Sequence, residues 1–100
     1  MKVVLTKSPK REKKFRAYFV ESGRHVDFGQ RGYSDYTIHK DEERMHRYLN
    51  RHDGMGETWG VKGIQSAGFW ARWLLWSKPS LSEAKKLMSK KFKIKFVSAR

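Results

Sequence analysis

Polar and hydrophobic residues alternate in the first part of the chain, and this alternation predicts a β-strand. Within residues 14–20, Phe15, Ala17 and Phe19 fall on one face and polar residues fall between them. A period of two with one hydrophobic face is typical of a strand that packs one side against a core. The sequence therefore predicts a half-buried strand at this position.

Two further strands are predicted beside the first one. Residues 1–6 contain the run Val-Val-Leu, which favours a pleated and half-buried surface. Residues 24–28 follow a Ser-Gly turn signal and would return as the second arm of a hairpin with residues 14–20. A charged segment, residues 7–13, is expected to form a loop between the first two strands.

The hydrophobic period then lengthens to that of a helix. Helices are predicted over 41–51, over 67–76 and from residue 81 onward, the last one after a Ser-x-x-Glu capping box at residues 80–83. Residues 53–65 are expected to form a long loop. In residues 91–96, hydrophobic residues alternate with lysines, which predicts a final strand.

This order of elements predicts an α+β fold: a small antiparallel sheet of three or four strands with two or three helices packed on one face. Residues 1–100 are expected to form a single domain. The helix over 67–76 is hydrophobic on nearly all sides, which is typical of the centre of a domain. Trp70, Trp73 and Leu74 are therefore predicted to be buried, with Phe15 and Phe19 packed against them.

Several classes of protein are disfavoured by the composition. The chain contains no cysteine, which excludes disulfides and thiolate metal sites. Its longest apolar stretch, residues 67–76, is about half the roughly 20 residues that span a bilayer. The N-terminal apolar run is too short for a signal peptide. We expect a soluble intracellular protein, or one packed inside a larger assembly, with no membrane partner.

The positive charge is concentrated at the two ends of the chain. Residues 1–16 carry a net charge of +6 and residues 78–100 carry +7, whereas residues 17–77 carry none. Two basic flanks around a neutral, aromatic-rich centre indicate a module that binds a polyanion or an acidic protein surface. The predicted binding residues are Lys10, Arg11, Lys13, Lys14, Lys91, Lys93 and Lys95.

The lysine flanks also have simpler interpretations. They could form a solvated face that keeps a small protein soluble, and lysines on a terminal strand could protect a sheet edge from pairing. If the last strand lies beside an N-terminal one, the two flanks would merge into one basic surface.

No catalytic, metal-binding or cofactor-binding motif is evident. The four histidines lack the spacing of metal ligands, and the arginine stripe Arg44, Arg47 and Arg51 is interpreted as structural, paired with nearby acids. In the segment 32–41, we predict a loop in which Asp35 or His39 bonds the backbone. Trp59, in a glycine-rich loop, is the tryptophan expected to contact a partner.

The run from Phe28 to Asp41, Phe-Gly-Gln-Arg-Gly-Tyr-Ser-Asp-Tyr-Thr-Ile-His-Lys-Asp, resembles the hallmark of a family of small basic uncharacterised proteins. Large nucleocytoplasmic DNA viruses, algal and mimivirus-like, encode this family. The similarity extends over about residues 14–96 and includes the stretch from Ser66 to Trp76. The resemblance implies a viral origin, and it carries over no activity and no functional residues.

These observations give three hypotheses. The first is a non-enzymatic viral structural protein, a minor capsid or internal virion component, which binds an acidic capsid surface or the genome through its basic flanks. It would reside in the virion, and in the host cytoplasm or nucleus during assembly. The second is a free nucleic-acid-binding protein for packaging or transcription. The third is a small metal-dependent nuclease. The first two need no cofactor and no small-molecule substrate.

Overall fold

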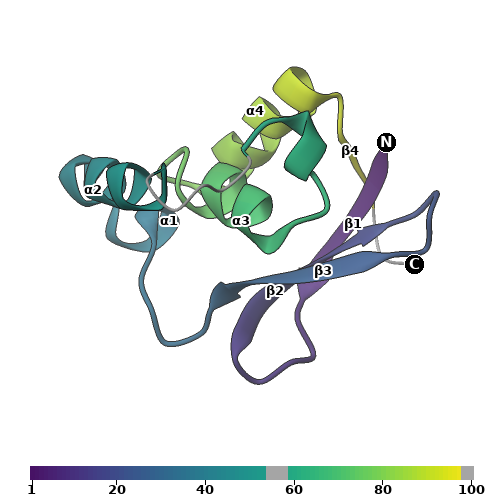
Figure 1. The fold of residues 1–100 in the computed structure, drawn as a ribbon, viewed down its shortest axis with the longest axis horizontal. Coiled ribbons are helices and arrows are strands. Elements are labelled where there is room, and N and C mark those ends of the chain that lie inside the picture. Colours follow the sequence, from purple (N-terminus) through teal and green to yellow (C-terminus); the bar gives the residue numbers. More distant parts are fainter. Residues whose placement is uncertain (54–58, 98–100) are drawn as a thin grey trace.

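A computed structural model of the chain describes residues 1–53 and 59–97. It contains a four-stranded sheet in the order β3-β2-β1-β4 (Figure 1), built from β1 (Lys2–Lys7), β2 (Lys13–Phe19), β3 (His25–Gln30) and β4 (Lys95–Val97). β1 pairs with β2, and β2 with β3, in antiparallel directions. β4 runs parallel to β1, so the sheet is mixed. The predicted α+β class is confirmed.

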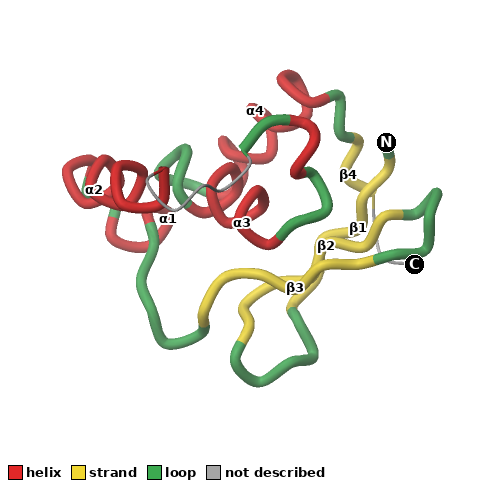
Figure 2. The backbone as a smooth tube through the Cα atoms, viewed as in Figure 1, coloured by secondary structure: helices red, strands yellow, loops and turns green. Residues whose placement is uncertain are grey.

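Helices cover one side of this sheet (Figures 1 and 2). Described in chain order, they are α1 (Tyr36–His39), α2 (Glu42–Asp53), the 3₁₀ turn η1 (Val61–Gly63), α3 (Ala67–Trp70), the π-helical turn η2 (Ala71–Leu75) and α4 (Leu81–Phe92). α3 and α4 lie over the sheet, whereas α1 and α2 lie beyond the end of β3.

Trp70 lies at the centre of the core and is fully buried. Its ring centroid lies 6.1 Å from that of Phe19, 5.8 Å from that of Phe28 and 6.1 Å from that of Phe96. The predicted burial of Trp70 and Leu74 is confirmed, and so is the packing of Phe19 against this helix. The alternation in the N-terminal strands therefore selects the core face correctly.

Trp73 departs from its predicted burial, since it is only partly buried. Its indole Nε1 donates a hydrogen bond of 2.7 Å to the Trp59 carbonyl oxygen. The Arg72 guanidinium lies 4.2 Å from the Trp73 ring centroid and 5.4 Å from that of Trp59. Burial lowers the pKa of Arg72. Trp59, expected to contact a partner, thus lies in an internal cation–π cluster.

Serine caps begin two helices where the sequence indicates them. The Ser66 hydroxyl accepts from the Phe69 backbone N–H at 3.2 Å, and the Ser80 hydroxyl accepts from the Glu83 N–H at the same distance. These bonds satisfy backbone donors that a helix start leaves unpaired.

Two local predictions are wrong. The segment 32–41 contains the helical turn α1 in place of a continuous loop. At the other end, α4 continues to Phe92, so the final strand is shorter than predicted. The ring centroid of Phe92 lies 4.9 Å from that of Phe69 and 5.2 Å from that of Trp73. These contacts stabilise the last turn of the helix. Lys93 then adopts the left-handed conformation (φ 55°) that ends the helix.

Candidate functional site

A cleft of about 620 Å³ is lined by the start of β2, the end of β3 and parts of the helical layer. Sixteen of the described residues line it: Lys13, Lys14, Gly29, Gln30, Tyr33, Ser34, Asp35, Arg44, Tyr48, Arg51, His52, Ala67, Gly68, Ala71, Leu75 and Trp76. They come from the strand ends, the segment after β3, α2 and the α3–η2 helix. A concave site of this size is typical of a ligand-binding cleft.

Cationic side chains approach the cleft from two directions. Lys13 and Lys14 come from the start of β2, and Arg44 and Arg51 come from α2. The only carboxylate among the described lining residues is Asp35. The lining therefore has a formal excess of three positive charges, which favours an anionic ligand.

The two arginines share one face of α2 because they are seven residues apart, close to two helical turns. Both are exposed. Arg47, the third member of the stripe, is also exposed but does not line the cleft. The structure therefore divides the arginine stripe, which the sequence indicated to be structural, into two cleft residues and one residue outside the cleft.

Lys14 is held in place by a buried carboxylate. Its ammonium nitrogen donates to Asp35 Oδ2 at 2.7 Å, and only 15% of its side chain is exposed. The other oxygen, Asp35 Oδ1, accepts from the Thr37 backbone N–H at 2.9 Å and from the Thr37 hydroxyl, and so caps α1. Asp35 thus joins β2 to α1 and positions one cation of the cleft.

His39, the last residue of α1, contributes a second hydrogen bond to the backbone of the same segment. Its Nδ1 accepts a hydrogen bond of 2.9 Å from the Asp41 backbone N–H, just before α2. Burial, and next the nearby Arg44 charge, lower the pKa of His39. Hydrogen bonds of Asp35 and His39 to the backbone were the structural role predicted for this segment, and both are confirmed.

Aromatic rings form one wall of the cleft. The Tyr48 ring stacks on Trp76, with centroids 4.1 Å apart and planes 2° from parallel, and on His52 at 4.1 Å and 29°. Tyr33, in the segment between β3 and α1, lines the cleft as well, and 67% of it is exposed. The cleft therefore combines cations with aromatic surfaces.

Small residues make room for the cleft. Ala67, Gly68 and Ala71 present little side-chain volume on the helical side. Gly29, at the strand edge of the cleft, instead allows β3 to pack closely on η2, since its φ is +76° and a Cβ added there would lie 2.8 Å from Leu75 Cδ1. Only glycine satisfies both the backbone conformation and the close approach.

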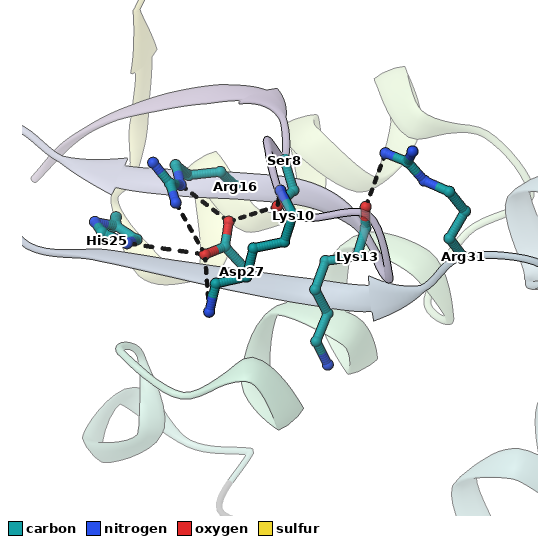
Figure 3. Close-up of polar contacts among 7 residues, drawn as sticks. All are labelled: Ser8, Lys10, Lys13, Arg16, His25, Asp27 and Arg31. Atoms are coloured by element: carbon teal, nitrogen blue, oxygen red, sulfur yellow. Dashed lines mark hydrogen bonds and ion pairs between the residues drawn. The ribbon is translucent and has the colours of Figure 1, made fainter.

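A second polar cluster lies on the sheet face opposite the helices (Figure 3). Asp27 accepts from Arg16 at 2.9 and 3.1 Å and from the Ser8 hydroxyl at 2.8 Å. Lys10 and His25 approach the same carboxylate to 3.8 Å. The hydrogen bond from Arg16 lowers the pKa of Asp27 to about 2. The buried carboxylate of Asp27 thus contacts three basic side chains, those of Lys10, Arg16 and His25.

The predicted N-terminal site residues occupy two different environments. Lys10 and Arg11 lie in the loop between β1 and β2, and Figure 3 shows Lys10 directed toward Asp27 while Lys13 points away from that cluster. Lys13 and Lys14 line the cleft. Lys10 and Lys14 each have an acidic partner in the folded chain, because strand pairing and chain reversal bring distant carboxylates to them.

The C-terminal lysines do not share one strand face, contrary to the prediction. Lys91 belongs to α4, Lys93 ends that helix and Lys95 begins β4. Lys95 pairs with Lys2 at the start of β1, whereas Lys7 at its other end pairs with Phe15 of β2. Lys2 of the N-terminal flank therefore lies beside Lys95, whereas the predicted binding residues of that flank follow the other end of β1, about 17 Å away along the strand. The pairing of β4 with β1 does not bring the two sets of predicted binding residues into one patch.

Residues 3–52 match a family of unknown function, DUF5754. The chain belongs to this family. The matched segment is half of the chain and extends from β1 into α2. It therefore includes all four cations of the cleft, as well as Tyr33. No curated protein and no solved structure shows significant similarity.

Two further properties bear on the hypotheses. Across residues 1–53 and 59–97, no three histidine, aspartate or glutamate side chains gather as a metal ion would require. No helix in this part of the DUF5754 protein has the length and apolar character needed to cross a membrane.

Proposed function

We propose that this DUF5754 protein is a non-enzymatic nucleic-acid-binding protein and that the cleft is its binding centre. The observation that carries the proposal is the set of four cations from two separate elements around one concave, aromatic-walled site. Phosphates bind basic side chains irrespective of sequence, and aromatic rings stack on bases. Neither feature requires a metal ion or a nucleophile.

The basic residues outside the cleft extend this proposal. Arg11 lies on the exposed loop before the Lys13–Lys14 pair, so it can add a phosphate contact at the cleft's edge. Lys10 shares Asp27 with Arg16, yet 55% of its side chain is exposed. Arg11 would therefore continue the path of a bound strand beyond the cleft, whereas Lys10 is directed toward the Asp27 cluster on the other face of the sheet.

The virion hypothesis belongs to the same proposal. The sequence resemblance implies a virus-encoded protein, and the polyanion would then be the viral genome, within the particle or during assembly. A second partner, an acidic capsid-protein surface, is favoured by the separate position of Lys91, Lys93 and Lys95. The two partners would use opposite ends of β1. Mass spectrometry of purified particles tests the virion assignment directly.

Binding of a fluorescein-labelled oligonucleotide, measured by anisotropy at several salt concentrations, tests the proposed function. Affinity should fall linearly with salt on a double-logarithmic scale. Arg44→Ala and Arg51→Ala should each weaken binding about tenfold, equivalent to ~1.4 kcal/mol, and reduce the salt slope by about one.

Arg47→Ala is the matched control, because it removes the same charge from the same helix outside the cleft. It should change affinity much less than the two cleft variants do. Equal effects of all three substitutions would mean that net charge, and not the cleft, determines binding. Undiminished binding in the Arg44→Ala/Arg51→Ala double variant would refute the proposed site. Loss of binding only on removal of Lys91, Lys93 and Lys95 would assign it to the other flank.

A further inference from the structure

Building on the proposed function, we propose that the cleft selects single-stranded nucleic acid. One unpaired base would stack on Tyr33, and the neighbouring phosphates would contact Arg44 and Arg51. The inference names the class of ligand and adds a specificity residue, Tyr33, that basic charge alone would not identify.

The position of the cations supports an unpaired strand. Lys14 is largely enclosed, and Asp35 beside it is buried. A duplex presents its phosphates on a convex surface and keeps its bases paired inside. A single strand can turn a base and its phosphate into a hollow. The enclosed position of Lys14 within a concave site therefore favours a flexible strand over a double helix.

Tyr33 provides an accessible stacking surface at this site. It is the most exposed aromatic residue among those described, at 67%, and it lines the cleft together with the two arginines. Tyr36 and Tyr48, in contrast, are buried. Leaving a large aromatic ring exposed beside cations is typical of proteins that bind single strands by base stacking.

The backbone around Tyr33 determines the position of this ring. Gly32, with φ +92°, reverses the chain after β3, and the Tyr33 N–H donates to the Gln30 carbonyl oxygen at 3.3 Å. Two residues later, the buried Asp35 anchors the segment to Lys14. The ring is therefore carried by a short turn that is held at both ends, which limits the ordering cost of binding.

Other aromatic residues line the same cleft. The stacked rings of Tyr48 and Trp76 contribute to its lining, as Tyr33 does. A base on Tyr33 would thus enter a space that aromatic side chains and cations line together. This arrangement tolerates any base, because each base has a π-face.

Anisotropy with a labelled 12-nucleotide oligo-dT, oligo-U of the same length and a 12-base-pair duplex tests the inference. Both single strands should bind more tightly than the duplex. Tyr33→Ala should weaken single-strand binding about tenfold with an unchanged salt slope, because it removes stacking and no charge. Tyr33→Phe should retain most of the affinity.

Tyr18→Ala is the matched control. Tyr18 is the other exposed tyrosine of the described residues, and it lies outside the cleft. Its removal should leave single-strand affinity within about twofold of the parent. Thermal unfolding of Tyr33→Ala should match the parent protein, since the ring is exposed, so that lost binding reports the ligand contact.

The outcomes separate this inference from the proposed function. Duplex binding as tight as single-strand binding, or full affinity in Tyr33→Ala, would overturn the inference even if Arg44→Ala and Arg51→Ala still weaken binding. Failure of the parent protein to bind any of the three oligonucleotides would instead overturn the proposed function.

Discussion

Tyr48 of α2 lies face to face with Trp76, which follows η2, with ring centroids 4.1 Å apart. The contact joins a helix beyond the end of the sheet to the central helical layer. Arg44 lies four residues before Tyr48 and Arg51 lies three residues after it, so the same helical face carries both arginines and the stacked ring. The stack therefore helps to position the two cleft cations that α2 carries, Arg44 and Arg51.

Tyr48→Ala should destabilise the protein by about 3 kcal/mol, because it removes a buried aromatic side chain and its stacking contacts. Tyr48→Phe should cost far less, since the ring remains. Urea unfolding monitored by circular dichroism measures both. If the two variants were equally stable, the stack would not anchor α2.

Gly29→Ala should destabilise the fold by about 3 kcal/mol, through a positive φ and a clash with core residues. The new Cβ would lie 2.8 Å from Leu75 Cδ1 and 3.3 Å from Lys14 Cβ, and Leu75 is buried. Gly32→Ala is the control: it also has a positive φ, but no atom lies within 4 Å, so about 1 kcal/mol is expected. Chemical denaturation of both variants would reveal the difference, and equal losses would contradict the steric argument.

The sequence predicts the strands and the helix starts well because their signals are local. Alternation placed Phe19 on the core face, and the serines at 66 and 80 act as caps where the pattern indicates. In residues 91–96, however, the alternation of lysine with hydrophobic residues fits either a strand or a helix end. The packing of Phe92 on Phe69 favours the helix, and these two residues are 23 positions apart in the sequence.

The cleft was harder to predict, because it depends on long-range contacts. The spacing of Arg44 and Arg51 already places them on one helical face, and this signal was available in the sequence. The pairing of Lys14 with Asp35 was not, since it depends on the chain reversal after β3. Net charge therefore indicated a basic binding site, but it could not indicate which basic side chains lie close together in the folded protein.

Asp27→Asn should lower stability at pH 7 by about 1–2 kcal/mol, because charge-assisted bonds to Arg16 become neutral ones. The folded pKa of Asp27 is about 2, below its ordinary value of 3.8. Its contribution is therefore complete above about pH 4 and is lost as the pH falls toward 2. Acid titration followed by circular dichroism should show a shallower loss of stability in Asp27→Asn over this window. Parallel acid curves for the two proteins would contradict this role.

His39 should make stability depend on pH near neutrality. Its Nδ1 accepts the Asp41 N–H, so the folded protein holds the imidazole neutral, and burial lowers its pKa below the ordinary 6.5. In the unfolded chain the ring gains a proton below pH 6.5, whereas in the folded protein it does so only at lower pH. Stability should therefore be complete above this range and should fall as the pH drops from about 6.5 through the folded pKa.

The His39→Asn variant tests this account, because an amide oxygen can still accept from Asp41 and does not titrate. Its urea midpoint should change less between pH 7.5 and 5.5 than that of the parent protein. His46→Asn is the control, since it removes an exposed histidine from α2, and its urea midpoint should change more between the two pH values than that of His39→Asn. If His39→Asn and the parent protein lost stability equally over this interval, another group would be responsible, and the neutral His39 would not couple the start of α2 to pH.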